Sequence, residues 1–325
     1  MRILVTGAAG YIGSYTTLKL QEEGHWTLGY DNLSKGHKDF IFTNKFIKGD
    51  VHNKNLLTKI LKKYDIEAVM HFAAFIEAGE SMENPKKYFY NNTVGTISLL
   101  DAIVECNVKY FIFSSTAALY GNPDKLPIEE DAPLVPTNPY GESKLLIEKI
   151  LNWYSQIYDF KYISLRYFNA AGADSKLRTG ELHNPETHLI PLAVQTALGK
   201  REALYIYGTD YRTKDGTCIR DYIYVEDLAD AHIKALNYLV KKNKSDVFNL
   251  GSGNGWTVKE VVETVKKVTG KNFKVIETSR RKGDPEILIA SSKKIEKVLN
   301  WKPQNQNLEK IIETSVNFYE KYKKI

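Results

Sequence analysis

The fold is decided by a glycine-rich stretch near the N-terminus, which reads Thr6-Gly7-Ala8-Ala9-Gly10-Tyr11-Ile12-Gly13. It follows a short apolar run, Ile3–Val5, that we interpret as a buried strand. Gly7 allows a sharp strand-to-helix turn, Gly10 lets the backbone approach a diphosphate, and Gly13 lets the helix pack closely on the sheet. The helix N-terminus then presents free N–H groups to the anion. The stretch predicts a dinucleotide site; the alternative is a glycine turn without a ligand.

An acidic residue at the end of the second expected strand indicates which dinucleotide is bound. Asp31 stands 24 residues after Gly7. A carboxylate at that point accepts hydrogen bonds from the adenosine ribose hydroxyls and repels a 2′-phosphate. We therefore predict NAD as the cofactor, although the nearby Lys35 leaves NADP open.

Short apolar runs alternate with helix-compatible segments over the first two thirds of the chain. Strands separated by helices indicate βαβ units and a parallel sheet covered on both faces. We predict an α/β fold, a Rossmann-like doubly wound parallel sheet with a smaller C-terminal substrate-binding lobe. The expected strands are Ile3–Val5, Trp26–Tyr30, Phe46–Lys48, Ala68–Phe72, Tyr110–Phe113, Tyr162–Phe168 and a further buried run at Val247–Gly251, and the clearest expected helices are Ser14–Glu23 and Asn55–Tyr64.

The composition changes near residue 170, where Gly, Pro and Thr become frequent. The buried run at Val247–Gly251 then returns to the strand pattern, so the lobes interleave in sequence. We predict an NAD-binding domain of residues 1–171 plus roughly 222–251, and a substrate-binding lobe of residues 172–221 and 252–325. A chain of 325 residues is long enough for either one large α/β domain or two smaller ones.

Composition excludes several classes of protein. Hydrophobic residues make up 43% and charged residues 26% of the chain, which excludes disorder, collagen-like structure and a coiled-coil rod. No apolar run approaches the ~18 residues that span a bilayer, and two cysteines cannot form a disulfide scaffold. The apolar run after Met1 is too short for a secretory signal, so we expect a cytoplasmic protein. The net charge of +6 comes from lysines interspersed with glutamates, so we expect neither a nucleic-acid nor a membrane partner.

Hydroxyl side chains end the fifth expected strand, in Phe113-Ser114-Ser115-Thr116. Because ligands bind at the carboxyl ends of strands in such sheets, we expect these hydroxyls to face the crevice. Asn138-Pro139-Tyr140 then opens a helix on which Tyr140 and Lys144 share a face. An ammonium near a phenol lowers a pKa that is normally ~10. Tyr140 is thus predicted to be a general base.

The Tyr-x-x-x-Lys spacing occurs four times, and only Tyr140 follows a strand that ends in Ser and Thr. We expect the other three pairs on solvent-exposed helix faces. These pairs are Tyr15/Lys19, Tyr238/Lys242 and Tyr319/Lys323.

With these motifs in view, the chain resembles the UDP-glucose (UDP-galactose) 4-epimerase family of extended short-chain dehydrogenases/reductases. The similarity runs nearly end to end. Besides the glycine stretch, Asp31 and the Tyr140 region, it rests on Gly49-Asp50-Val51, His71-Phe72-Ala73-Ala74, Gly79-Glu80-Ser81, Tyr90-Asn91-Asn92, Leu165-Arg166-Tyr167-Phe168-Asn169, Asp215-Gly216-Thr217, Arg220-Asp221-Tyr222 and Asn249-Leu250-Gly251.

The resemblance implies a set of site residues. Thr116, Tyr140 and Lys144 would be catalytic and would also contact the cofactor. NAD would further contact Gly7, Gly10, Tyr11, Ile12, Gly13, Asp31, Asn32, Leu33, Ser34, Lys35, Gly36, Asp50, Val51, Phe72, Ala73, Ala74, Asn91 and Phe168. The UDP-sugar would contact Thr116, Tyr140, Asn169, His188, Leu189, Tyr205, Tyr207, Arg220, Arg281, Asp284 and Leu288.

The implied reaction is epimerisation at C4 through a 4-keto sugar. Tyr140 would take the C4 hydroxyl proton while the hydride moves to NAD. Thr116 would hold the same oxygen, and Lys144 would bind the nicotinamide ribose. A 4,6-dehydratase needs a further acid and base after the threonine, where Ala117 and Ala118 stand here. Another nucleotide-sugar epimerase or dehydratase, or a non-catalytic NAD-binding sensor, remains the alternative.

At three positions the chain differs from members of the family it resembles. Ile76 replaces a lysine common in relatives, and His188 replaces the commoner Asn. Leu288 stands where relatives restricted to plain hexoses carry tyrosine, which predicts that N-acetylated UDP-hexosamines are also accepted, unless Leu288 only packs in a buried strand. The resemblance also suggests a homodimer through the helices after Asn91 and around Tyr140.

We expect no metal site. His183 and His188 fall in an expected loop without convincing carboxylate partners. His71 ends a strand and is expected to be packed there rather than to bind a metal.

Overall fold

The computed structural model describes residues 1–281 and 284–322 and contains a central sheet of seven parallel strands. Their order across the sheet is β11-β6-β5-β4-β1-β2-β3, so the order reverses between β4 and β1. This confirms the predicted doubly wound sheet, and it puts the binding crevice at the carboxyl ends of those two strands. The strands are β1 (Arg2–Thr6), β2 (Trp26–Asp31), β3 (Lys45–Lys48), β4 (Ala68–His71), β5 (Tyr110–Thr116), β6 (Lys161–Tyr167) and β11 (Asp246–Leu250).

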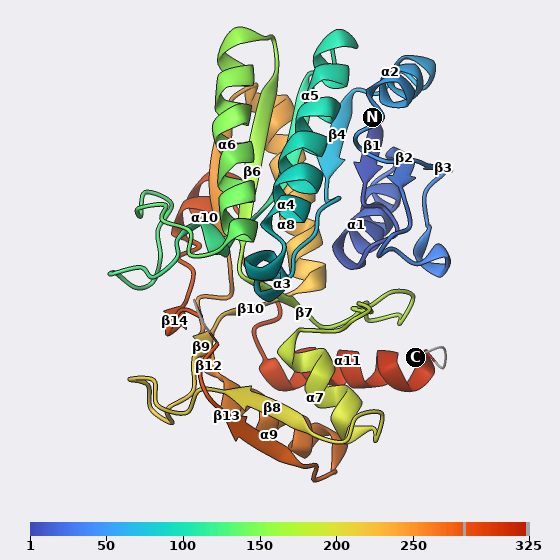
Figure 1. Ribbon diagram of the computed structural model, residues 1–325. Coiled ribbons are helices and arrows are strands. Elements are labelled where there is room, and N and C mark those ends of the chain that lie inside the picture. Colours follow the sequence, from blue (N-terminus) through green and yellow to red (C-terminus); the bar gives the residue numbers. More distant parts are fainter. Residues whose placement is uncertain (282–283, 323–325) are drawn as a thin grey trace.

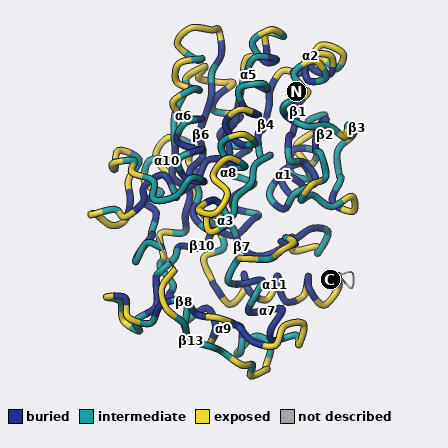
Figure 2. Tube along the Cα trace, viewed as in Figure 1, coloured by how far each residue is buried: buried dark blue, intermediate teal, exposed yellow. Residues whose placement is uncertain are grey.

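Helices cover both faces of the sheet (Figure 1). Alternate residues of β1 belong to different cores, because successive side chains of a strand point to opposite faces: Ile3 and Val5 pack with α1 and α8, and Leu4 packs with α2, α5 and α6. Figure 2 shows the strands in the centre as buried. These helices are α1 (Tyr11–Glu22), α2 (Lys54–Lys63), α5 (Gly95–Glu105), α6 (Pro139–Ile157) and α8 (Val225–Lys242), and the short α3 (Ala78–Glu83), α4 (Pro85–Tyr88) and π-helical η2 (Phe89–Val94) precede α5.

A smaller layer lies beyond the carboxyl ends of the strands, in the lower part of Figure 1. Its core joins α7, α9 and α11 through residues such as Val194, Val261 and Ile312. Its elements are β7 (Asn169–Ala171), α7 (Leu189–Ala197), β8 (Leu204–Tyr207), β9 (Ile219–Arg220), β10 (Tyr222–Tyr224), β12 (Trp256–Thr257), α9 (Val258–Thr269), β13 (Val275–Thr278), β14 (Ile287–Leu288) and α11 (Leu308–Lys321).

One segment crosses the predicted division of the chain. Helix α10 (Lys293–Leu299) falls in the predicted substrate lobe, yet Ile295 and the following Trp301 pack in the core on the α8 side of the sheet. The division into two domains stays a prediction. Among the described helices, none has both the length and the apolar character to cross a membrane.

Candidate active site

A cavity of about 820 Å³ lies between the carboxyl ends of the sheet strands and the smaller layer. Its size suits a cofactor and a substrate lying side by side. Of the predicted site residues, Leu33, Asp50 and Lys144 do not line it. Those that do are Gly7, Gly10, Tyr11, Ile12, Gly13, Asp31, Asn32, Ser34, Lys35, Gly36, Val51, Phe72, Ala73, Ala74, Asn91, Thr116, Tyr140, Phe168, Asn169, His188, Leu189, Tyr205, Tyr207, Arg220, Arg281, Asp284 and Leu288.

The glycine stretch forms the turn from β1 into α1, as predicted. Gly7 has a φ of +70°, and a Cβ there would lie 2.7 Å from the Ala73 nitrogen. A Cβ on Gly13 would lie 2.2 Å from the Gly7 oxygen. Helix α1 begins at Tyr11, directly after Gly10. The backbone is therefore exposed to the cavity at a helix N-terminus, which is the arrangement that binds a diphosphate.

Asp31 lies at the end of β2 and faces the same cavity. Its carboxylate accepts hydrogen bonds from the Ala9 nitrogen at 3.0 Å and the Leu33 nitrogen at 2.7 Å. Burial raises the pKa of Asp31, and these backbone hydrogen bonds oppose the rise. The carboxylate is thus held in place where a ribose would lie, so the residues present fit an adenine dinucleotide.

Asp50 and Leu33 do not line the cavity but contact residues that do. Asp50 accepts a hydrogen bond from Asn32 Nδ2 at 2.9 Å, and its Oδ1 lies 2.6 Å from His52 Nδ1. Leu33 has a φ of +61°, and its nitrogen binds Asp31. Both residues therefore position neighbours that do line the cavity.

Tyr140 lies in the first turn of α6, where Pro139 and the capping side chain of Asn138 fix the helix start. The Asn138 side chain accepts a hydrogen bond from the Gly141 nitrogen at 2.9 Å. Tyr140 is buried. Burial and the nearby Tyr167 raise its pKa well above the ordinary value, and a hydrogen bond with the Thr116 side chain lowers it in part.

Lys144 does not lower the pKa of Tyr140 as the spacing predicted. Its Nζ donates a hydrogen bond to the Ser114 carbonyl at 2.8 Å. Burial lowers the pKa of Lys144 to about 7, so its charge is partly lost near neutral pH. A bound ring with a positive charge beside Tyr140 would lower the pKa of Tyr140, because a nearby positive charge favours the phenolate. It would supply the effect that was expected from Lys144.

The hydroxyls at the end of β5 do not all face the crevice. Ser114 Oγ lies 2.6 Å from the Tyr167 hydroxyl, and Ser115 Oγ donates to Glu148 Oε1 at 2.6 Å. Only Thr116 of the three lines the cavity. The prediction was wrong for both serines. Ser115 points away from Ser114 and Thr116, because successive side chains of a strand point to opposite faces. Ser114 points the same way as Thr116, but its hydroxyl contacts that of Tyr167.

The other Tyr-x-x-x-Lys pairs are not all on exposed faces. Tyr15 and Tyr319 are buried and belong to the core of the smaller layer. Helices α1 and α11 both contribute to that core, so their tyrosines face inward while Lys19 stays near solvent.

Cationic and aromatic side chains gather on the opposite wall of the cavity. Arg220 Nη2 lies 3.1 Å from Asp284 Oδ1, and the Arg281 guanidinium lies 3.9 Å from the centre of the Tyr207 ring. Asn169 Nδ2 donates to the Asp221 carbonyl at 2.9 Å. Two guanidinium groups on one wall can bind a diphosphate.

Leu288 both packs in the core and lines the cavity. It lies in β14 and packs in a small buried cluster with Phe168, Tyr120 and Ile128, and it also lines the cavity.

His71 is packed, as expected. Its Nδ1 lies 2.7 Å from Thr6 Oγ1, and its Nε2 lies 2.9 Å from Thr96 Oγ1. Burial lowers the pKa of His71 to about 3, with a smaller contribution from the charge of Lys144.

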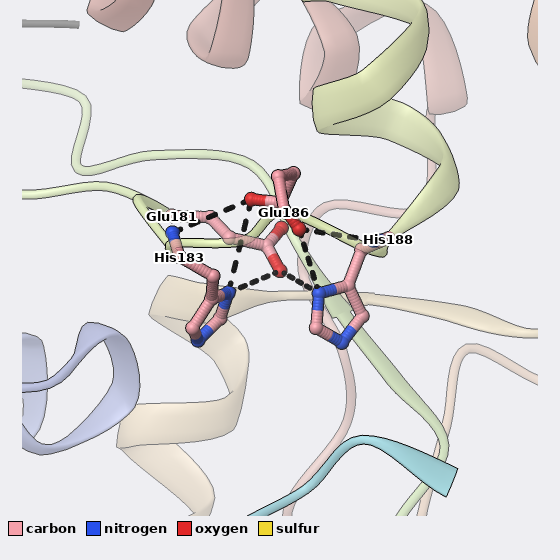
Figure 3. A group of neighbouring side chains, drawn as sticks. All are labelled: Glu181, His183, Glu186 and His188. Atoms are coloured by element: carbon pink, nitrogen blue, oxygen red, sulfur yellow. Dashed lines mark hydrogen bonds and ion pairs between the residues drawn. The ribbon is translucent and has the colours of Figure 1, made fainter. Parts of the chain in front are cut away.

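His183 and His188 do have carboxylate partners, contrary to expectation. His188 Nδ1 lies 2.9 Å from Glu181 Oε1 and 3.0 Å from Glu186 Oε1. Burial alone would lower the pKa of His188, but Glu181 and Glu186 raise it well above its ordinary value. Figure 3 shows these side chains gathered in one loop. The spacing Glu-x-His-x-x-Glu-x-His was the signal in the sequence that our reasoning missed.

Comparisons with known proteins show which family the chain resembles. The model of the NAD dependent epimerase/dehydratase family matches residues 3–251. The UDP-glucose 4-epimerase of Halalkalibacterium halodurans is 49% identical over 99% of this chain and 96% of its own length.

Two solved structures are also similar over nearly the whole chain. The UDP-glucose 4-epimerase from Brucella ovis, solved in complex with NAD, is 43% identical with a TM-score of 0.94, covering 98% of both chains. The UDP-Glc/GlcNAc 4-epimerase from Campylobacter jejuni is 44% identical with a TM-score of 0.85, covering 98% of this chain and 99% of that one. The chain therefore belongs to the NAD dependent epimerase/dehydratase family, and within it to the UDP-glucose 4-epimerases.

Proposed function

We propose that the protein interconverts UDP-glucose and UDP-galactose by epimerisation at C4, with NAD as its cofactor. The observation that carries the proposal is that one cavity unites three parts. The glycine turn and Asp31 form one end, Arg220 and Arg281 form the other, and Tyr140 with Thr116 lies on the wall that they share.

The proton-transfer step belongs to Tyr140. As a phenolate, Tyr140 takes the proton of the C4 hydroxyl, and Thr116 hydrogen-bonds the same oxygen. NAD, when bound, accepts the hydride from C4 and returns it. Tyr140 then gives the proton back when the hydride reaches the other face of the sugar, so the protein needs a single proton carrier.

The nucleotide handle keeps the 4-keto sugar from leaving while it turns over. Arg220 and Arg281 are suited to hold the diphosphate, because a planar guanidinium binds phosphate oxygens with two parallel hydrogen bonds. Asn169, Leu189 and Tyr205 complete the proposed nucleotide site. Binding energy from the remote nucleotide thus supports a step at the sugar.

Ala117 and Ala118 favour epimerisation over dehydration. Both residues line the cavity immediately after Thr116. A methyl side chain cannot transfer the additional protons that the loss of water requires.

The direct test is an assay of the purified full chain with UDP-galactose and no added NAD. We expect UDP-glucose to form, because the hydride returns and NAD is never consumed. Absence of conversion by folded protein that contains NAD would contradict the proposal. A requirement for added NADP would contradict the choice of cofactor, and Asp31→Ala should weaken NAD binding more than NADP binding.

The wall formed by Leu288 supports activity on N-acetylated UDP-hexosamines as well. Leucine occupies less space than tyrosine and leaves no hydroxyl unpaired beside an acetamido group. Leu288→Tyr should depress kcat/KM for UDP-N-acetylgalactosamine more than for UDP-galactose, by steric exclusion. Equal losses on both substrates would mean that Leu288 acts only through packing.

Exposed apolar side chains support a homodimer through α6 and the preceding η2. Trp153 and Ile157 of α6 are 62% and 67% exposed, and Val94 of η2 is 43% exposed. Such side chains on neighbouring elements fit a second copy of the chain. Trp153→Lys should convert a dimer into a monomer in light-scattering measurements, and a monomeric wild type would contradict this assignment.

The free thiols Cys106 and Cys218 fit a reducing, cytoplasmic location.

A further inference from the structure

Four side chains of one loop converge on the same small space. Glu181, His183, Glu186 and His188 lie between β7 and α7, and each offers one ligand atom within 4.8 Å of the others. Figure 3 shows that the two imidazole rings and the two carboxylates point toward one another. Because all four come from eight consecutive residues, the loop alone sets this arrangement.

The separations between these atoms match a tetrahedral metal site. His188 Nδ1 lies 2.9 Å from Glu181 Oε1 and 3.0 Å from Glu186 Oε1. His183 Nδ1 lies 3.4 Å from the same Glu181 oxygen and 3.8 Å from the other Glu186 oxygen, Oε2. With metal–ligand bonds of about 2.0–2.2 Å, neighbouring ligands of a tetrahedral ion stand roughly 3.4 Å apart. The histidine–carboxylate separations bracket that spacing, and one ligand atom from each of the four residues lies within 4.8 Å of the others. The side chains would have to move closer together, with one Glu186 oxygen turned to the centre, to complete the site.

An orphaned nitrogen points to a missing partner. His183 Nδ1 is buried and has no hydrogen-bond partner among the described residues, although the Glu181 oxygen lies 3.4 Å away. The ring is therefore close to the carboxylate but not aligned with it. A ligand at the centre of the four atoms would use the lone pair of this nitrogen.

The buried negative charge of the cluster also favours a bound cation. The side chains of Glu181 and Glu186 are only 7% and 3% exposed. Within 4 Å of their oxygens, the cationic groups in the described part of the chain are the two histidines. Buried carboxylates require compensation by a cation or by several hydrogen bonds. Glu186 also accepts hydrogen bonds from the Thr187 nitrogen at 2.8 Å and the His188 nitrogen at 2.9 Å, so the charge of Glu181 is the one that depends on a nearby cation.

We propose that this cluster binds one divalent transition-metal ion through both Nδ1 atoms and one oxygen of each glutamate. Imidazole with carboxylate suits Zn²⁺, whereas Mg²⁺ prefers six oxygens. On binding, the Nδ1 positions lose their protons to solvent and each ring keeps its proton on Nε2. Glu181, His183 and His188 line the cavity, which gives the ion an entry path. The ion would hold the loop and the start of α7 in place, and this proposal does not depend on the proposed reaction.

Zinc binding to the full chain tests the proposal. After treatment with a chelator, the protein is titrated with Zn²⁺ in competition with a chromogenic chelator. Wild type should bind one Zn²⁺ per chain, and His183→Gln should bind it at least about 100-fold more weakly. His25→Gln is the matched control, because His25 lies beside the Met1 amino group and outside the cluster.

Glu186→Gln provides a second variant in case His183→Gln does not fold, and it too should lose Zn²⁺. Bound Co²⁺ should show the intense visible bands of a four-coordinate ion in wild type, and Mg²⁺ should not raise the Tm. Absence of stoichiometric Zn²⁺ binding would overturn the proposal. So would unchanged affinity in a folded Glu186→Gln protein.

Discussion

At the scale of single residues, the position of Tyr140 suits it to transfer a proton more than the charge of Lys144 does. It lies in a helix first turn with its hydroxyl beside Thr116, while Lys144 contacts the Ser114 carbonyl. In the sequence, Tyr140 and Lys144 stand out from three other Tyr-x-x-x-Lys pairs because they alone follow a strand that ends in Ser and Thr. The direction of the Lys144 ammonium could not be predicted, since it depends on a backbone carbonyl of β5 that no pattern reports.

Replacing Tyr140 by Phe keeps the ring and removes the proton acceptor. We expect turnover of UDP-galactose to fall by ~100-fold or more, while co-purified NAD is retained. Tyr64→Phe makes the same chemical change at a residue that stacks on Trp26, outside the cavity, and should keep full activity. Near-normal turnover by folded Tyr140→Phe would exclude Tyr140 as the base.

His71 should make the protein sensitive to acid. Its pKa is about 3 in the fold because of burial, against an ordinary value of 6.5. Between these pH values the unfolded chain binds a proton on His71 that the folded protein does not. The contribution of neutral His71 to the free energy of unfolding is therefore fully present above pH 6.5 and is lost as the pH falls below it. The loss is about 1.4 kcal/mol per pH unit. In His71→Gln the free energy of unfolding should fall less steeply from pH 6.5 to 4.5, and parallel profiles would contradict this.

At the scale of elements, the short strands around Asp221 hold the substrate wall together. The Asp221 carboxylate accepts hydrogen bonds from the Ser252 nitrogen at 2.8 Å, the Gly253 nitrogen at 3.0 Å and the Ala290 nitrogen at 3.1 Å. It thereby joins the segment between β9 and β10 to the ends of β11 and β14. Burial raises the pKa of Asp221 to about 6, against the effect of these donors.

Asp221→Asn should destabilise the protein, because an amide NH₂ would meet N–H groups that need an acceptor. We expect a cost of about 3 kcal/mol, measured as a Tm lowered by roughly 5 °C. Asp230→Asn is the control, since Asp230 pairs with Lys234 on the surface of α8. Equal Tm values for the two variants would show that Asp221 does not join these strands.

The strands of the central sheet could be predicted from the sequence, and the two-residue strands of the smaller layer could not. Strands β1, β2 and β6 lie where apolar runs indicated, although β4 ends at His71 rather than Phe72 and β5 continues to Thr116. Two-residue strands such as β9 and β14 are too short to show a period. Their pairing is set by contacts between segments more than sixty residues apart, including Ile219 with Ile287.

At the scale of the whole molecule, the cavity exists because two layers meet at the carboxyl ends of the sheet. The glycine turn and Asp31 come from the first 31 residues, and Arg220 and Asp284 come from the smaller layer. The doubly wound fold was predictable from alternating strands and helices. The cluster of Glu181, His183, Glu186 and His188 was missed, although its regular spacing stands in the sequence; the folded loop shows that the four side chains share one space.

The central claim is that one bound NAD takes a hydride from C4 and returns it to the same carbon. The most direct measurement is conversion of UDP-galactose carrying deuterium at C4, in ordinary water and without added NAD. The account predicts UDP-glucose that keeps the deuterium at C4, formed over many turnovers of each chain. Loss of the deuterium to solvent, or conversion that stops after a single turnover unless NAD is supplied, would contradict it.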